Sequence, residues 1–250
     1  IQRAQQLGYT SLAITDRNSL AGIVRAHTAA RDLELGLIIG AEVTFQDAPA
    51  CLLWATQRAS YGRLCRLLTR GRRRSEKGEC QLRFQDLADH AEGLLAGVIP
   101  RWHGPGHALS GNHDRLTTDI PLAGESHLHR YRDLFQDRAS LLVEPPHGPN
   151  DTQQLEHVQQ LSRSSHLPLL AAGDVHYHVP ERMELHDVLT AIANNCTVPQ
   201  AGQQRFSNAE RHLRTREEIS AIYRDIPEAL ERTQQVARQC LFSLDQLRYE

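Results

Sequence analysis

The sequence lacks several features that would place it in a class at once. It contains no run of about 18 apolar residues, so it predicts no membrane span. It shows no secretory signal and no internal repeat. It begins with IQRAQQLGYT, which is typical of the second half of an amphipathic helix ending at Gly8. The simplest interpretation is that the sequence is a fragment that starts inside an element of a longer chain.

Cysteine is scarce and scattered, and no C-x-x-C pair is present. An odd number of distant cysteines indicates reduced thiols in a cytoplasmic protein, and it argues against a disulfide framework or a zinc knuckle. The five residues are Cys51, Cys65, Cys80, Cys196 and Cys240.

The formal net charge is only −2, but basic residues are concentrated in one segment. Residues 58–77 contain eight Lys or Arg and one acid, Glu76, so they carry +7 and the other residues carry −9. A nucleic-acid-binding module is usually basic over a whole face. The segment therefore has two interpretations, a solvated surface after a helix or a contact with DNA or an acidic partner. The residues that would make this contact are Arg70, Arg72, Arg73, Arg74 and Lys77.

Short apolar runs typical of buried strands alternate with helical patterns. This alternation predicts an α/β protein with a mainly parallel sheet, and six strands in one domain favour a closed or nearly closed barrel over an open sheet. We expect the barrel to occupy residues 1–180 and a helical extension to occupy residues 181–250. The predicted strands are residues 11–15, 36–45, 50–56, 94–99, 139–144 and 167–174. The predicted helices include residues 20–34, 60–69, 151–165 with Asp151 as N-cap, 181–194, 215–224 with a Thr215–Glu218 capping box, and 227–240.

Carboxylate and imidazole side chains follow four of the predicted strands, where α/β barrels carry their functional groups. They are Asp16, Glu42, the pair Glu144 and His147, and the pair Asp174 and His176. Zinc, manganese and iron accept such ligands, and clusters of these ions bind phosphate and activate water. The sequence therefore predicts a metal site at this edge of the sheet.

Each of these residues also has a structural interpretation. Asp16 is equally suited to capping the helix that follows it, and His147 to an ordinary place in a loop. Asp174 and His176 form the strongest pair, because residues i and i+2 of an extended segment point to the same side. They could also simply hydrogen-bond to each other. We expect His178 and His186 to lie at the surface or behind the ligands.

Several segments together resemble the PHP (polymerase and histidinol phosphatase) domain of bacterial C-family DNA polymerases, in particular the error-prone branch. The resemblance covers nearly the whole chain. It is carried by YTSLAITDRNSLAGIVRAHTAA, LIIGAEVTF, RLLTRGRRRSEKGEC, GDVHYHVPER, NAERHLRTREEI and FSLDQLRYE.

The resemblance implies a distorted seven-stranded (β/α) barrel whose rim can hold up to three metal ions, with zinc or manganese as candidates. The family's first strand carries a His-x-His pair, which would lie upstream of Ile1. Asp16 matches the next family motif, Thr-Asp-His, but Arg17 stands at the histidine position. The other matching ligand positions are Glu42, His147, Asp174 and His176.

Arg17 argues against a working metal site. A guanidinium supplies no ligand, and its repulsion of a divalent ion at about 4 Å in an effective dielectric of about 20 would be roughly 8 kcal/mol. We therefore expect Arg17 to pair with Asp16, Glu42 or Asp174 and the domain to be a structural scaffold with a degraded metal site. The alternative is an active metal-dependent phosphoesterase or 3′–5′ exonuclease of the same superfamily.

The resemblance also implies a longer parent chain, an error-prone DNA polymerase that synthesises DNA across damage. Its partners would be DNA, nucleoside triphosphates, accessory mutagenesis proteins and a sliding clamp, and its catalytic magnesium would lie beyond Glu250. The sequence itself contains no Gly-rich phosphate loop and no paired catalytic aspartates of the polymerase type. We therefore expect no polymerase active site in these residues.

Overall fold

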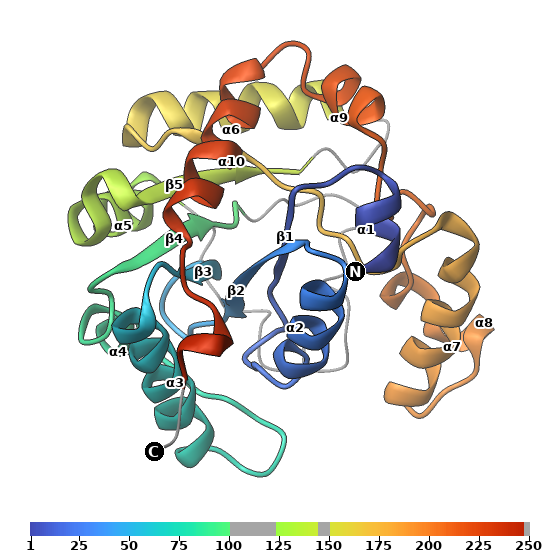
Figure 1. Cartoon of the computed structure of the whole chain (residues 1–250), viewed down its shortest axis with the longest axis horizontal. Coiled ribbons are helices and arrows are strands. Elements are labelled where there is room, and N and C mark those ends of the chain that lie inside the picture. Colours follow the sequence, from blue (N-terminus) through green and yellow to red (C-terminus); the bar gives the residue numbers. More distant parts are fainter. Residues whose placement is uncertain (101–123, 145–150, 248–250) are drawn as a thin grey trace.

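The core of the molecule is a curled six-stranded sheet in the order β1-β2-β3-β4-β5-β6 (Figure 1). The computed structural model describes residues 1–100, 124–144 and 151–247, so the predicted site residue His147 lies outside the described residues. The strands are β1 (Ser11–Ile14), β2 (Gly36–Val43), β3 (Cys51–Ala55), β4 (Leu94–Val98), β5 (Ala139–Val143) and β6 (Leu169–Ala171). All six coincide with predicted strands, and the α/β class is confirmed.

Strand direction fixes which ends of the sheet can share a site. β1 pairs with β2 in parallel, β2 and β4 both pair with β3 in antiparallel, and β4, β5 and β6 pair in parallel. Only β3 among these strands therefore runs against the others. The carboxyl ends of the other five strands lie at one edge of the curled sheet, which we call the rim.

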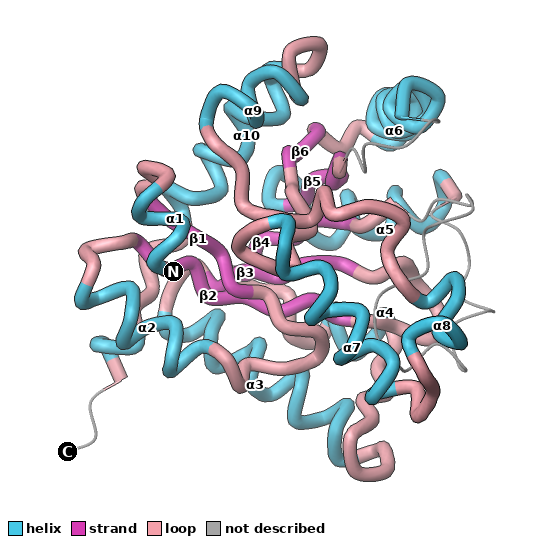
Figure 2. The backbone as a smooth tube through the Cα atoms, turned by 90° about the vertical axis from the view of Figure 1, so that its right-hand side faces the viewer, coloured by secondary structure: helices cyan, strands magenta, loops and turns pink. Residues whose placement is uncertain are grey.

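Helices cover the sheet and extend beyond it (Figure 2). The helices are α1 (Gln2–Gln6), α2 (Ile23–Asp32), α3 (Arg58–Arg73), α4 (Phe84–Ala88), α5 (Glu125–Phe135), α6 (Asp151–Ser165), α7 (Met183–Ala193), α8 (Val198–Ala201), α9 (Arg216–Ile222) and α10 (Pro227–Gln239). The described residues also form the short 3-10 helices η2 (Gln136–Arg138), η3 (Pro180–Arg182), η4 (Gly202–Gln204) and η5 (Leu244–Gln246). Within the described residues, none of the helices has the length and apolar character that crossing a membrane requires.

Two helix starts test the predicted caps. The Thr215–Glu218 capping box is confirmed, because the Thr215 amide donates to Glu218 Oε2 at 2.6 Å and the Glu218 amide donates to Thr215 Oγ1 at 3.2 Å. Asp151 is the first residue of α6 and not its N-cap, so that prediction is wrong by one position. The carboxylate still lies in the first turn, where the helix dipole favours a negative charge.

The main hydrophobic core fills one side of the sheet beneath α3, α5 and α6. Tyr131 and Phe135 of α5 are fully buried there, and the Tyr131 ring packs edge-on against Phe84 at 5.1 Å between centroids. Burial of one such side chain stabilises the fold by about 1.5–3 kcal/mol. All five cysteines are free thiols, and burial raises the pKa of Cys51, Cys65, Cys80 and Cys240, which makes these thiols weak nucleophiles.

The last two helices close onto the strands. Tyr223 lies just after α9, and its hydroxyl donates to the carbonyls of Val143 at 3.0 Å and Ala172 at 2.6 Å. Val143 is the last residue of β5, and Ala172 directly follows β6. Tyr223, Ile226 and Ala229 belong to the main core, and α10 packs along β6. Residues beyond 180 thus contribute to the core of the barrel, while the division of the chain at residue 180 stays a prediction.

Candidate functional site

Asp16 follows β1 and shapes the turn into α2. Its Oδ2 accepts a hydrogen bond from the Gly22 amide at 3.1 Å, immediately before the helix. A Cβ atom at position 22 would lie 2.6 Å from the same oxygen, so a larger residue there would displace the carboxylate. The contact orders the turn before α2, but it is not an N-cap bond, because Gly22 is the N-cap and no side chain caps the helix.

Arg17 forms an ion pair with Glu42. Its Nε lies 3.1 Å from Glu42 Oε1, and about a quarter of each side chain is exposed, 25% and 24%. The backbone brings the two residues together, because Arg17 and Glu42 form a parallel bridge and the Asn18 amide donates to the Glu42 carbonyl at 2.7 Å. The carboxylate at a predicted metal-ligand position therefore binds a guanidinium.

Asp174, after β6, binds the guanidinium of Arg211, which is not among the site residues predicted from the sequence. Arg211 pairs with Asp174 Oδ2, while His176 Nε2 lies 3.2 Å from Oδ1 of the same carboxylate. Asp174 holds a positive φ of 40°, a conformation that few side chains adopt without support. The Arg211 carbonyl supplies further support, since it accepts the amides of His176 at 3.0 Å and Tyr177 at 3.2 Å.

The rings of Phe206, His176 and His186 pack together beside the Arg211–Asp174 ion pair. The Arg211 guanidinium lies 4.2 Å from the Phe206 ring centroid, within the range of a cation–π contact. His186 of α7 stacks on Phe206 at 4.7 Å, and His176 meets the two rings edge-on at 4.9 and 5.3 Å. Burial lowers the pKa of His176 and of His186, so both imidazoles tend to be neutral. His186 thus lies behind His176, whereas His178 is exposed.

Glu144, at the end of β5, completes the cluster. Burial raises its pKa to about 7, a nearby Arg211 opposes the shift, and Glu42 adds to it. His176 in turn feels the charges of Glu42 and Arg17. The ion pairs of Glu42 and Asp174, together with the pairing of β5 and β6, gather the ends of β1, β2, β5 and β6 and the segment around Arg211 into one cluster. We call it the rim cluster, and its members are Arg17, Glu42, Glu144, Asp174, His176 and Arg211.

The rim cluster does not fit a metal centre in the part of the chain that the structure describes. Within residues 1–100, 124–144 and 151–247, no group of three or more His, Cys, Asp or Glu side chains is arranged to hold an ion. The physical reason is charge, because guanidinium groups already occupy the carboxylates of Glu42 and Asp174. Two permanent cations beside the same oxygens would repel a divalent ion.

The basic segment after Arg58 is largely used inside the fold. Asp86, only 5% exposed, pairs with Arg70 Nε at 3.0 Å and with Arg74 Nη1 at 2.7 Å. Arg70 also reaches Asp89 at 2.8 Å. Two of the five predicted DNA-contact residues are therefore neutralised by acids of the same chain.

The remaining three basic residues differ from one another. Arg72 donates from Nη2 to the Asn18 carbonyl at 2.8 Å and from Nη1 to the Gly78 carbonyl at 3.3 Å, so it ties α3 to the turn after β1. Arg73 and Lys77 are exposed and have no hydrogen bond or ion pair with any described residue. Arg73 borders a hollow of about 480 Å³ lined also by Ser19, Cys65 and Thr69.

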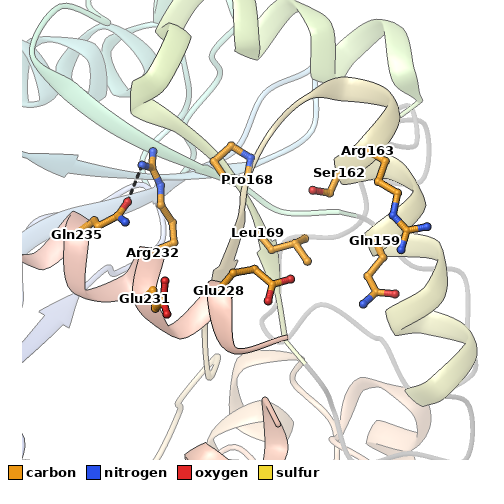
Figure 3. Close-up of a pocket in the computed structure, with 9 residues that line it drawn as sticks. All are labelled: Gln159, Ser162, Arg163, Pro168, Leu169, Glu228, Glu231, Arg232 and Gln235. Atoms are coloured by element: carbon orange, nitrogen blue, oxygen red, sulfur yellow. Dashed lines mark hydrogen bonds between the residues drawn. The ribbon is translucent and has the colours of Figure 1, made fainter. Parts of the chain in front are cut away.

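Another hollow lies between α6 and α10, at the start of β6 (Figure 3). It has a volume of about 370 Å³ and is lined by Gln159, Ser162, Arg163, Pro168, Leu169, Glu228, Glu231, Arg232 and Gln235. Arg232 is committed to the protein itself, with Ser140 Oγ at 3.0 Å and Gln235 Oε1 at 3.2 Å. Because Asp174 follows the other end of β6, this hollow is separate from the rim cluster.

Comparison with known proteins identifies the family of the chain. The sequence model of the PHP domain matches residues 1–144. The chain belongs to the PHP domain family. A crystal structure from Bifidobacterium adolescentis described as that of a metal-dependent phosphoesterase aligns with a TM-score of 0.47 and 14% identity, over 70% of this chain and 79% of that one.

Curated relatives of this PHP domain are much longer proteins. Error-prone DNA polymerases from Rhodopirellula baltica, Pseudomonas aeruginosa and Caulobacter vibrioides are 46%, 41% and 37% identical to it, over 100%, 99% and 98% of the chain. The matched part is 21%, 22% and 21% of their respective lengths. The chain thus spans about a fifth of these relatives.

Proposed function

We propose that this chain is the PHP domain of an error-prone DNA polymerase and that its rim cluster is a structural ion-pair network in place of a metal centre. The relatives, which are error-prone DNA polymerases, support DNA polymerisation as the parent activity. In this proposal the parent enzyme copies damaged template, uses magnesium and nucleoside triphosphates, and works in the cytoplasm. These residues would supply the scaffold, and the rest of the parent chain would supply nucleotidyl transfer.

The paired arginines support the structural role. Arg17 binds Glu42 across β1 and β2, and Arg211 binds Asp174 just beyond β6. Each guanidinium compensates the negative charge of a strand-end carboxylate that would otherwise lie beside other carboxylates. The cluster can thus hold the ends of the strands together without an ion.

The same arrangement disfavours hydrolysis of phosphodiesters by this domain. Metal-assisted hydrolysis needs an ion with an open coordination position and an activated water. In the rim cluster the carboxylates face guanidinium groups, and Phe206 covers one side of His176. The carboxylates of Glu42 and Asp174 are therefore already engaged by arginines and are not free to hold such an ion.

Asp174→Asn in the full-length protein tests this proposal. The substitution keeps the shape but removes the charge that holds Arg211. We expect lower thermal stability of the domain, no phosphodiester hydrolysis in either protein, and an unchanged rate of primer extension per folded molecule. Asp32→Asn is the matched control, because Asp32 pairs with Arg31 at 3.6 Å on an exposed surface. Metal-dependent hydrolysis by the unmodified protein that disappears in Asp174→Asn would instead establish the phosphoesterase alternative.

A further inference from the structure

Helix α7 has an apolar face that nothing in the described structure covers. Leu185, Val188, Leu189 and Ile192 are 47%, 44%, 55% and 69% exposed. They follow one another at helical spacing, i, i+3, i+4 and i+7, so they form one continuous stripe. We call this stripe the α7 face.

The position of α7 explains why this face is open. The helix packs against α8 and η3. It lies at the right-hand edge of the molecule in Figure 1 and on the side that faces the viewer in Figure 2. Its opposite side carries His186, Asp187 and Thr190, of which Asp187 pairs with Arg205 at 3.1 Å. The polar side of α7 therefore points into the protein, and the apolar side points outward.

Charge is also sparse in the sequence from the middle of α7 onward, after Glu184 in its first turn. Residues 188–204, VLTAIANNCTVPQAGQQ, contain no Asp, Glu, Lys, Arg or His in a chain in which 23% of residues are charged. Depletion of charge around an apolar centre is the compositional signature of a protein–protein contact. DNA would require basic residues here.

We propose that the α7 face docks against the remaining part of the polymerase chain, through an uncharged apolar surface of that part. This inference rests on the proposed function. Relatives match this domain along its whole length, and the matched part is only 21% and 22% of them, so most of such a polypeptide is available to pack beside it. An exposed apolar helix face is suited to such a contact, since contiguous exposed apolar patches mark interaction sites and a hydrophobic interface restrains the relative motion of domains.

Thiol labelling of the full-length protein tests this contact. Ile192→Cys places a thiol in the α7 face, and Val24→Cys places one on α2 at a residue that is 66% exposed and isolated from other apolar residues. Labelling at each position is followed by peptide mass spectrometry in native protein and in protein unfolded with guanidinium. We expect the thiol of Ile192→Cys to react at least about tenfold more slowly in the native protein than in the unfolded one. The thiol of Val24→Cys should react at similar rates in the two states.

If the thiol of Ile192→Cys reacts as fast in the native protein as in the unfolded protein, the inference is overturned. Leu189→Cys repeats the test at a second position of the same stripe. Protection that disappears on dilution, together with a dimer in sedimentation, would assign the face to a second copy and would also overturn the inference. Primer extension is measured on the same preparations, so that an active polymerase with an unprotected α7 face refutes the docking alone. A full-length protein without polymerase activity refutes the proposed function.

Discussion

At the scale of single residues, Arg211 connects more of the rim than any residue expected from the sequence. Its guanidinium pairs with Asp174 and lies over Phe206, and its side chain is only 13% exposed. Its carbonyl holds the amides of His176 and Tyr177. A single side chain thus compensates a strand-end carboxylate and fixes the segment that follows β6.

Replacing Arg211 by Met should therefore destabilise the domain. Methionine keeps an apolar stem over Phe206 but loses the charge, and we expect a loss of about 1–2 kcal/mol in the free energy of unfolding. Urea denaturation measures it. Arg31→Met is the control, since Arg31 and Asp32 are both more than 60% exposed and such pairs contribute about 0–1 kcal/mol. If Arg211→Met and Arg31→Met lose the same free energy of unfolding, the contacts of Arg211 stabilise the domain no more than an exposed ion pair does.

Glu144 makes stability depend on pH. Folding raises its pKa from 4.5 to about 7, so the native state holds the proton more tightly than the unfolded chain. Its contribution is complete below pH 4.5 and is lost as the pH rises through 7, by at most about 3 kcal/mol. His176 and His186 act in the opposite direction, because their lowered pKa values cost stability as the pH falls below 6.5.

The variant Glu144→Gln isolates this effect. Glutamine stays neutral, so the stability of the unmodified protein relative to Glu144→Gln should fall between pH 4.5 and 7 and then level off. Chemical denaturation at several pH values, after treatment with a chelator, gives the two curves. Glu181→Gln is the control at an exposed position. Parallel curves for Glu144→Gln and the unmodified protein would contradict the burial of a protonated carboxyl.

At the scale of elements, Asp86 joins α3 to α4. Its carboxylate accepts Arg70, Arg74 and the Arg83 amide, the last at 2.9 Å, and it is almost fully buried. Asp86→Asn would leave two guanidinium groups beside a neutral amide. We expect it to cost about 3 kcal/mol, against less than about 1 kcal/mol for Asp89→Asn, whose carboxylate is 42% exposed. Thermal unfolding of the two variants provides the comparison, and a similar shift for both would refute the buried network.

The same network limits what the basic segment can offer to DNA. Among the five predicted contact residues, only Arg73 and Lys77 are both exposed and unpaired within the described part of the chain. We therefore expect Arg73→Glu with Lys77→Glu to leave the salt dependence of DNA binding by the full-length protein unchanged, as measured by fluorescence anisotropy. A fall of about 2 in the slope of log K against log salt would show that both cations contact phosphates.

The sequence predicted the strands well because each is a short apolar run between turns. Every predicted strand exists, although β6 is shorter than residues 167–174. The reversed direction of β3 could not be predicted, since a run buried on both faces has the same pattern in either direction. Helix α3 is longer than predicted, Arg58–Arg73, because its last turns carry arginines that pair with the following segment.

The candidate site was only partly predictable. Glu42, Asp174 and His176 stood out because they follow apolar runs, and Arg17 because it interrupts a family motif. Arg211 follows no strand and lies in an irregular segment, so only the folded chain brings it to Asp174. Its position within the NAERHL motif was the one available signal, and that motif by itself indicated only the family.

At the scale of the whole molecule, the sheet directs five carboxyl strand ends to one rim, where charged side chains gather. Arginines from two distant segments pair with the carboxylates there. The fold of the family is thus compatible with a rim whose cohesion comes from side chains of the chain itself.

Metal analysis of the full-length protein tests this account most directly. The protein is purified without chelator, dialysed, and assayed for zinc, manganese and iron by mass spectrometry. The ion pairs of Arg17 and Arg211 predict well below one ion per chain, with no difference between the unmodified protein and Asp174→Ala. One or more tightly bound ions per chain, released by Asp174→Ala, would contradict the central claim.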